Sequence, residues 1–354
     1  MRPLGPGLAI ILLGCAADPV ADLPDAAAHD TIQRVSPDLG APDLLAPDVE
    51  LAPDGGACSS TEGAGVDVPA GLSDHFKAWL AASGYEVDDF DRSDLSGGSF
   101  GGLASDSDCA KREPVIFVHG NADRALGGTY GGWSASLKHF VKQGYRRAEL
   151  YGTTYGPASP LLMWDYTHSE ENVMQVRTFI EAVLAYTGAD RVDIIAHSMG
   201  VTMTRRAIKG GPGEDISGTF DVGPPLTDRV DTFVGIAGGN LGLSACYMTP
   251  AVPACSMTDG FYPGQLFLGE VIGQSTFIKE LNETTGYEGA YRYSMWSVAD
   301  EVVGGACLVW GSNTCKIPGH TAEKVYYVQP YGHYGMRDLT AEVQYQMVDN
   351  HSTK

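Results

Sequence analysis

Short apolar runs alternate with helix-patterned stretches along residues 109–354, and this alternation is typical of strands joined by helices. Continuous apolar runs predict buried strands at residues 115–118, 147–151 and 192–195. Three further strands are predicted at residues 232–236, 291–298 and 324–328. Strands that alternate with helices form parallel sheets, so we predict one α/β domain with a mostly parallel central sheet and helices on both faces.

The longest predicted helix spans residues 169–186. Ser169 can cap its first turn, where Glu170 and Glu171 favour the positive end of the helix dipole. Its apolar face consists of Val173, Val176, Phe179, Ile180, Val183 and Leu184. Shorter helices are predicted at residues 133–142, 201–208 and 339–348.

The N-terminal part of the chain has a different composition from the rest. Residues 16–57 are dominated by Ala, Asp and Pro and contain no aromatic side chain, so they cannot bury enough apolar surface to offset the entropy of ordering. We therefore predict a disordered linker over residues 15–57. Residues 58–105, rich in Gly and Ser, are predicted to form an N-terminal extension of a catalytic domain spanning residues 58–354.

Charge and length narrow the possible partners. The chain has 354 residues, 44 of them acidic and 23 basic, which gives a net charge of −21. This charge repels nucleic acid, so we expect no nucleic-acid partner. The longest continuous apolar stretch near the N-terminus, residues 8–13, is far shorter than the roughly 20 residues that a membrane-spanning helix needs.

That apolar stretch follows Arg2 and ends in Leu12-Leu13-Gly14-Cys15. The arrangement resembles the lipobox of bacterial lipoproteins. The resemblance implies that residues 1–14 are a signal peptide, that Cys15 carries the lipid, and that the protein is exported to the outer membrane or cell surface, with the lipid as its only membrane contact. It would be extracellular if the anchor were released. The alternative is an ordinary cleaved secretory signal.

Six cysteines remain after Cys15, an even number that suits an oxidising compartment. Local spacing favours the pairs Cys246–Cys255 and Cys307–Cys315, which leaves Cys58–Cys109. A zinc site is the alternative, but the chain has no C-x-x-C pair and no His at ligand spacing from these thiols. We expect no metal and no cofactor.

The strongest chemical signal is Ala196-His197-Ser198-Met199-Gly200, which follows a predicted strand and precedes a predicted helix. A nucleophile on such a sharp turn needs small residues two positions away on each side, because the strained backbone brings those positions close together. Ala196 and Gly200 satisfy this, although Gly is usual at the first position. We predict Ser198 as the nucleophile.

A serine nucleophile needs a base and an orienting acid, which follow it in the order Asp then His in this type of fold. Of the histidines after Ser198, His351 lies in the last four residues and should fray, and His320 lies in a loop before the last strand. His333 follows that strand in a loop flanked by glycines, so we predict His333 as the base. Asp300, after the run 291–299, is the predicted acid. Lesser candidates are Asp228, Asp231 and Asp259.

Acyl transfer also requires hydrogen-bond donors for the oxyanion. The loop after the strand 115–118 and the start of the helix after Ser198 offer the backbone N–H groups of Asn121 and Met199. We expect His119 to hold the shape of that loop by hydrogen bonding and His197 to serve in packing.

The segments 114–121 and 192–200, together with the neighbourhoods of Asp300 and His333, resemble the class 2 lipases of the α/β-hydrolase superfamily. The resemblance covers roughly residues 105–348. It implies an α/β-hydrolase fold without a cofactor. The implied site is a triad of Ser198, Asp300 and His333 with an oxyanion hole at Asn121 and Met199.

The arrangement of cysteines is closest to the single-domain extracellular polyhydroxybutyrate depolymerases. In that group a Cys precedes the first motif, as Cys109 does here, a Cys pair follows the segment equivalent to residues 237–239, and another pair follows the acid of the triad.

Two groups of apolar residues are candidates for the mouth or lid of an ester-binding site. One is the segment 161–166, and the other consists of Tyr247, Phe261, Tyr262, Phe267 and Leu268. The alternative is that both serve in ordinary loop packing. Three hypotheses follow. The chain is a serine ester hydrolase of lipase type, a polyester depolymerase with the same triad, or a non-catalytic surface lipoprotein that uses the fold for binding. The expected partner in the first two is an ester substrate at a lipid or polyester surface.

Overall fold

The computed structural model describes residues 67–128, 130–248 and 251–354, and all of them lie in one compact unit. The expected signal peptide, Cys15, the linker and Cys58 lie outside the described residues. Within the described part of the chain, no helix has the length and apolar character needed to cross a membrane.

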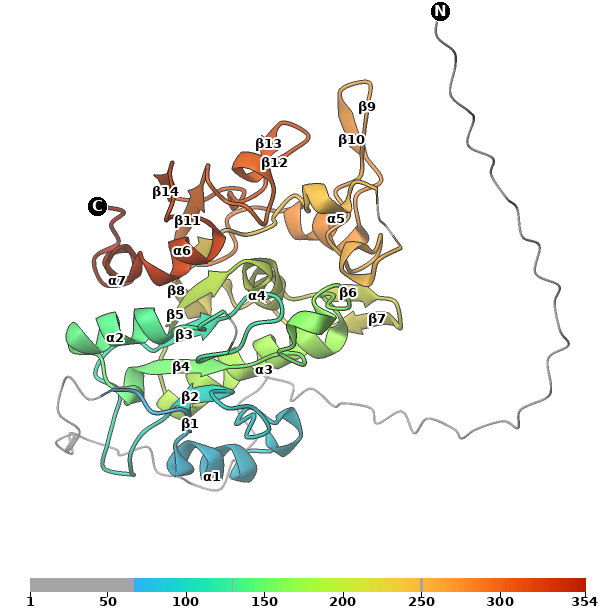
Figure 1. Cartoon of the computed structure of the whole chain (residues 1–354). Coiled ribbons are helices and arrows are strands. Elements are labelled where there is room, and N and C mark those ends of the chain that lie inside the picture. Colours follow the sequence, from blue (N-terminus) through green and yellow to red (C-terminus); the bar gives the residue numbers. More distant parts are fainter. Residues whose placement is uncertain (1–66, 129, 249–250) are drawn as a thin grey trace, which may run out of the picture. The chain divides into compact units, whose positions relative to one another are not determined.

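The core of this unit is an eight-stranded sheet in the order β1-β2-β4-β3-β5-β8-β11-β14 (Figure 1). All neighbouring strands pair in parallel except β2 and β4, which are antiparallel. The strands are β1 (Gly71–Leu72), β2 (Ser99–Gly101), β3 (Val115–Val118), β4 (Leu150–Thr153), β5 (Val192–His197), β8 (Val230–Ile236), β11 (Tyr291–Ser297) and β14 (Ala322–Tyr326). The predicted mostly parallel sheet is therefore confirmed.

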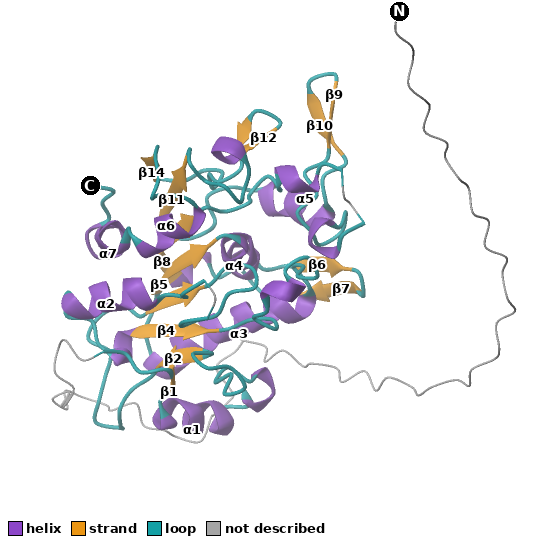
Figure 2. Ribbon diagram, viewed as in Figure 1, coloured by secondary structure: helices purple, strands orange, loops and turns teal. Residues whose placement is uncertain are grey.

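Helices cover both faces of the sheet, as Figure 2 shows in purple against the orange strands. The core on one face is shared by α1 (Asp74–Ala82), α3 (Glu170–Thr187), α4 (Met199–Lys209) and α5 (Thr276–Asn282). The core on the other face is shared by α2 (Ser134–Lys142), α6 (His333–Asp338) and α7 (Ala341–Asn350). Three outlying hairpins complete the unit: β6–β7 (Pro212–Asp215, Gly218–Asp221), β9–β10 (Gln265–Phe267, Glu270–Ile272) and β12–β13 (Leu308–Val309, Ser312–Asn313).

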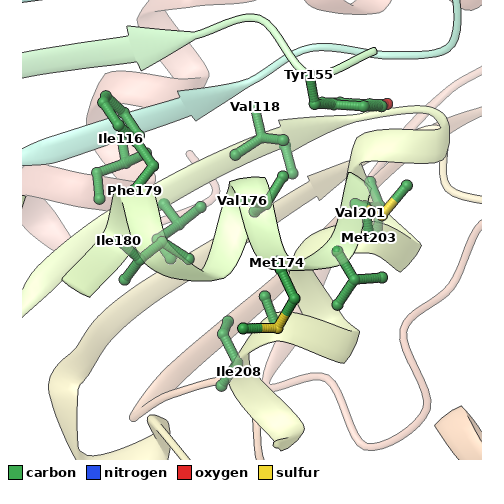
Figure 3. Close-up of a cluster of buried hydrophobic side chains, with 14 of the residues drawn as sticks. Ile116, Val118, Tyr155, Met174, Val176, Phe179, Ile180, Val201, Met203 and Ile208 are labelled. Atoms are coloured by element: carbon green, nitrogen blue, oxygen red, sulfur yellow. The ribbon is translucent and has the colours of Figure 1, made fainter. Parts of the chain in front are cut away.

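Strand β3 shows why the central strands are apolar at every position. Ile116 and Val118 belong to the core on the α3 side, whereas Val115 and Phe117 belong to the core on the α2 side. Successive side chains of a strand point to opposite faces, so a strand covered on both faces is apolar throughout. Figure 3 shows the first of these cores, where β3 meets residues of α3 and α4, among them Val176, Phe179, Ile180, Val201 and Met203. Burying each such side chain contributes about 1.5–3 kcal/mol.

The run at residues 147–151 differs from its prediction. Its first half is a 3-10 helix, η2 (Arg147–Glu149), and the strand β4 begins only at Leu150. The buried Glu149 carboxylate accepts hydrogen bonds from the backbone and the guanidinium of Arg146, both at 2.7 Å. These two hydrogen bonds stabilise the 3-10 turn, so the strand begins three residues later than predicted.

The N-terminal extension differs from its prediction in another way, because residues 71–72 and 99–101 join the central sheet as β1 and β2. Helix α6 is a further difference, since residue 333 begins a helix and does not lie in a loop. The glycines on either side of it concealed the helical pattern. Helix α5 and the three hairpins have no counterpart among the predictions.

Two of the three predicted disulfides are present, Cys246–Cys255 and Cys307–Cys315. Both close short loops in connections that follow β8 and β11. The third pairing, Cys58–Cys109, stays a prediction because Cys58 is outside the described residues.

Candidate active site

Ser198 lies at a sharp turn between β5 and α4. Its backbone angles are φ 55° and ψ −127°, a conformation that residues other than glycine seldom adopt. The Ser198 N–H donates to the Ile236 carbonyl at 2.8 Å, which ties the turn to the neighbouring strand β8. Ser198 itself is partly exposed while the residues on either side of it are buried. The backbone therefore presents this hydroxyl to solvent from an otherwise buried turn.

Two small residues make the turn possible. A Cβ atom at Gly200 would lie 2.3 Å from the His119 carbonyl oxygen, and a Cβ atom at Gly120 would lie 2.8 Å from the Ser198 Cβ. Both distances are shorter than any real carbon contact, so neither glycine can be replaced without a backbone shift. Ala196 is fully buried between β3 and β8, and its single methyl group fits there.

An acid and a base are hydrogen-bonded to each other: Asp300 lies in the loop after β11, and His333 is the first residue of α6, which follows β14. The Nδ1–H of His333 donates to Asp300 Oδ2 at 2.9 Å, and both side chains are buried. Asp300 Oδ1 accepts the backbone N–H groups of Val302 and Val303, each at 2.9 Å. Burial opposes ionisation of Asp300, but the hydrogen bond and charge of His333 and these two N–H groups outweigh it, so the pKa of the carboxyl lies below its ordinary value.

Two further side chains hold the backbone of His333. Its N–H donates to Glu301 Oε2 at 3.0 Å, and the absence of a side chain at Gly332 allows this approach, because a Cβ there would lie 2.3 Å from the same oxygen. Its carbonyl accepts the Nε2–H of His197 at 3.1 Å, and the two imidazole rings are 4.6 Å apart. Since His197 directly precedes Ser198, this contact brings the His333 segment to the Ser198 turn. The predicted packing role of His197 is thus extended by a specific hydrogen bond.

The predicted oxyanion donors lie in the loop after β3, which carries Asn121, and at the start of α4, which is Met199. His119 Nδ1–H donates to the Gly120 carbonyl at 2.7 Å, its Nε2 accepts the Tyr155 N–H at 3.1 Å, and its ring stacks on Tyr155. Burial lowers the pKa of His119 to about 3, so the imidazole stays neutral and fixes the loop, as expected from the sequence. Asn121 follows in this loop, and Met199 opens α4, where the first backbone N–H groups have no partner within the helix.

Sequence reasoning missed an ion pair behind this loop. The buried guanidinium of Arg337, one turn after His333 in α6, binds the buried carboxylate of Asp123 and the Tyr130 carbonyl. Asp123 belongs to the loop of Asn121, and its N–H donates to the Gly120 carbonyl at 3.2 Å. The pair therefore connects the helix of the predicted base to the loop that carries Asn121. Nothing in the local pattern signals it, because its partners are more than 200 residues apart.

The remaining candidates lie elsewhere. His320 Nδ1 bonds Ser294 Oγ at 2.9 Å. His351 stacks on Tyr291 and pairs with Asp231 at 2.9 Å, so the expectation that it frays is wrong, because the last residues pack against β11 and β8. The other two acids, Asp228 in η4 (Thr227–Arg229) and the buried Asp259 beside Ser256, are not paired with His333. Asp300 is the candidate acid bonded to the candidate base.

The expected apolar mouth is divided between core and surface. Tyr166, Phe261 and Tyr262 are buried, which agrees with ordinary loop packing. In contrast, Leu161, Leu162, Trp164, Phe267 and Leu268 are exposed. The segment that contains η3 (Pro160–Leu162) is held at the site, because Asn121 Nδ2 donates to the Met163 carbonyl at 2.8 Å.

Two groups of side chains within the described part of the chain have the spacing of metal ligands. One contains Asp300 with Cys307 and Cys315, but the two thiols form a disulfide and Asp300 binds His333. The other is an acidic cluster whose buried members already have partners, since Asp193 accepts the Thr232 N–H and Asp231 binds Arg191. Neither set has the open coordination positions that a catalytic ion needs.

Comparison with known proteins places the chain in a family. The model of the family "Lipase (class 2)" matches residues 112–346, about two thirds of the chain. Similar solved structures include the lipase B of Aspergillus fumigatus (16% identity, 67% of this chain and 52% of that one, TM-score 0.44). Others are the monoacylglycerol lipase of Paleococcus ferrophilus (12% identity, 72% and 98%, TM-score 0.44) and the lipase BlEst2 of Bacillus licheniformis (12% identity, 68% and 94%, TM-score 0.42). The chain thus spans about half of the length of the fungal lipase B. With its mostly parallel sheet and the match over residues 112–346, the chain belongs to the class 2 lipases and has the α/β-hydrolase fold.

Proposed function

We propose that this protein is a serine carboxylic-ester hydrolase in which Ser198, His333 and Asp300 form the catalytic triad. The observation that carries the proposal is the buried hydrogen bond between His333 and Asp300, in a segment that His197 connects to the strained turn of Ser198. A site that only bound a ligand would need neither the strained serine nor the oriented imidazole.

In the proposed reaction, Ser198 Oγ attacks the ester carbonyl carbon while His333 Nε2 takes the hydroxyl proton. The carbonyl oxygen becomes an oxyanion that accepts hydrogen bonds from the N–H groups of Asn121 and Met199, and losing one such donor typically costs about 2.7–4 kcal/mol. Asp300 holds the Nδ1–H of His333 and stabilises the imidazolium. His333 then gives its proton to the leaving alcohol oxygen, which breaks the ester bond and leaves an acyl group on Ser198. Water hydrolyses that acyl-enzyme by the same steps, releases the acid and restores the hydroxyl.

The test is the hydrolysis of a soluble activated ester by the purified full chain and by Ser198→Ala. We expect the substitution to lower kcat by about 10⁴-fold or more, because the nucleophile is removed. Arg112→Met, which removes one arm of a surface ion pair, serves as the control and should keep the wild-type rate. Equal inertness of the wild-type and Ser198→Ala proteins would reject the hydrolase proposal and favour the non-catalytic lipoprotein.

The same proteins distinguish lipase from polyester depolymerase. Acid release is measured from emulsified tributyrin and from amorphous polyhydroxybutyrate. We propose the lipase type, because the match over residues 112–346 is to class 2 lipases. A rate on the polyester far above that on tributyrin, abolished by Ser198→Ala, would instead establish the depolymerase.

We also propose that the enzyme is exported as a lipoprotein with its lipid on Cys15. Residues 8–15 support this, since a short apolar run ends in Leu-Leu-Gly-Cys.

A further inference from the structure

The hairpin β9–β10 is the most apolar exposed element in the described part of the chain. Its exposed side chains are Leu266 (49%), Phe267 (60%), Leu268 (91%), Val271 (40%) and Ile272 (51%). Figure 1 shows it projecting away from the rest of the unit. A solvated hairpin ordinarily turns one apolar face to the core and one polar face to water. This hairpin has no core-facing side.

The register of the hairpin shows that both of its faces are apolar. Leu266 is opposite Val271, which places these two side chains on one face. Phe267 is opposite Glu270, and Ile272 is opposite Gln265, which places Phe267 and Ile272 on the other face. Both faces therefore present apolar groups outward.

The residue at the tip is unusual for a turn in water. Leu268 has φ +51° and Gly269 has φ +89°, so both residues of the two-residue turn are left-handed. Such turns strongly favour Asn or Asp at the first position, because their side chains tolerate this backbone, whereas leucine is strained there. Folding alone would thus favour a polar tip, and the leucine points to a function for the apolar side chain.

The hairpin belongs to a connection that leaves the same edge of the sheet as Ser198. Strands β5, β8 and β11 are parallel, so the segments that follow their carboxyl ends meet at one edge. The hairpin lies in the connection after β8, and Asp300 lies in the one after β11. Trp310, in the latter, donates its Nε1–H to the Pro263 carbonyl at 3.2 Å and stacks on Tyr247, which fixes the base of the hairpin to the segment that carries Asp300.

Charge identifies the kind of surface that fits. Residues 232–278 contain no Lys, Arg or His, and their acidic residues are the buried Asp259 and the exposed Glu270. Proteins that bind anionic headgroups use Lys and Arg side chains, each of which contributes about 1 kcal/mol to the attraction. Residues 232–278 contain no such side chain. An uncharged, water-insoluble ester phase is the surface that complements it.

We propose that the hairpin β9–β10 is the contact through which the enzyme adsorbs to an uncharged, water-insoluble ester surface, with Leu268 at its leading point. This inference rests on the proposed ester hydrolase function and names the physical form of its substrate. Apolar side chains from the hairpin leave water on contact, and the hydrogen bond from Trp310 to the Pro263 carbonyl holds the base of the hairpin to the connection that carries Asp300.

Adsorption is measured without catalysis, using the full chain with Ser198→Ala so that the surface is not digested and Cys15→Ser so that no acyl chain contributes. Into this background we place Leu268→Asn, which suits the left-handed backbone, and separately Phe267→Thr. The control is Val87→Asn, since Val87 is also a highly exposed apolar residue (78%) but lies in η1 (Glu86–Asp88), between α1 and β2. The surfaces are a triolein emulsion, amorphous polyhydroxybutyrate granules and anionic phosphatidylglycerol vesicles.

We expect Leu268→Asn and Phe267→Thr each to weaken adsorption at least tenfold to the triolein or the polyester surface, and the surface where the loss occurs identifies the source of the ester. Val87→Asn should bind as the background protein does. Unchanged adsorption in both hairpin variants, tighter binding of the background protein to the anionic vesicles, or a dimer that dissociates in Leu268→Asn would each overturn the proposal. Unchanged melting temperatures exclude unfolding as the cause of a loss.

The enzyme with Ser198 intact separates this inference from the proposed function. In Leu268→Asn, the ratio of the emulsion rate to the soluble-ester rate should fall at least tenfold. A chain that adsorbs through the hairpin but hydrolyses no soluble ester would reject the hydrolase function alone. If the chain hydrolyses the soluble ester and Leu268→Asn leaves the ratio of emulsion rate to soluble-ester rate unchanged, only the proposed role of the hairpin is rejected.

Discussion

At the scale of single residues, the Ser198 turn depends on two positions that have no side chain, Gly200 and Gly120. Gly200 and Gly120 leave the room that the strained backbone needs, and the nearest atoms to an added Cβ are the backbone of residue 119 and the side chain of Ser198 itself. Backbone atoms cannot rotate away as a flexible side chain can. The glycines of the motif are therefore required by geometry, and Ala196, fully buried between β3 and β8, adds only a methyl group.

Gly200→Ala tests this requirement. We expect the free energy of unfolding to fall by about 1–3 kcal/mol from overpacking, measured by urea titration. We expect kcat on a soluble ester to fall about 10²-fold, because the nucleophile is displaced. Gly305→Ala is the matched control, since a Cβ at Gly305 would have no neighbour within 4 Å and its φ is not left-handed. Equal effects of the two substitutions would contradict the steric explanation.

At the scale of elements, the proposed site depends on how α6 is held against the loop after β3. Helix α6 has only six residues and no side-chain cap from its own N-cap residue Gly332. Short helices are marginal by themselves. Contacts from outside hold it: Glu301 binds its first N–H, His197 binds the carbonyl of its first residue, and Arg337 binds Asp123.

Arg337→Met should remove the last of these contacts and leave the Asp123 carboxylate buried without a counter-ion. We expect a loss of about 3–5 kcal/mol in the free energy of unfolding, measured by urea titration. The double substitution with Asp123→Asn should recover part of that loss, because no buried charge remains unpaired. Arg112→Met breaks a partly exposed ion pair with Asp349 and should cost about 1 kcal/mol or less. A double variant no more stable than Arg337→Met would show that the helix does not depend on the pair.

At the scale of the whole molecule, the chain combines a catalytic unit with an acidic, Pro-rich segment at its N-terminus. The acidic residues of segment 16–57 repel one another and the anionic headgroups of a membrane. This repulsion, with the net charge of −21, suits a protein that is attached to a membrane through a lipid on Cys15 but does not bind the headgroups. The lipid would then be the only attachment to the membrane.

Cys15→Ser tests the anchor in a bacterium that matures lipoproteins. We expect the wild-type chain in the membrane fraction and the variant in the soluble fraction, because no acyl chain can be attached without the thiol. Detergent phase partitioning checks the result on the purified proteins. Cys109→Ser, which also removes a cysteine, should partition as the wild-type chain does. A variant that stays in the membrane fraction would refute the anchor and favour an ordinary secretory signal.

The sequence by itself determined the strands β3, β5, β8 and β11, the long helix 170–187 with its Ser169 cap, and the residues of the Ser198 turn. These features are local, since a strand buried on both faces, an amphipathic helix and a strained turn each impose their pattern on neighbouring positions. Two disulfides of short span were predictable for the same reason. Asp300 and His333 were predicted from their positions after the strand-like runs 291–299 and 324–328, in the order acid then base.

Only the tertiary structure decided the contacts between distant segments. Arg337 and Asp123, or His197 and the carbonyl of His333, are joined across more than 100 positions, and no local period encodes them. The start of α6 at His333 was concealed by the glycines beside it, of which Gly332 leaves room for the Glu301 carboxylate and Gly335 leaves room for the Pro330 carbonyl. The joining of residues 71–72 and 99–101 to the sheet was equally hidden, because strands so short acquire their structure from the partner that they pair with.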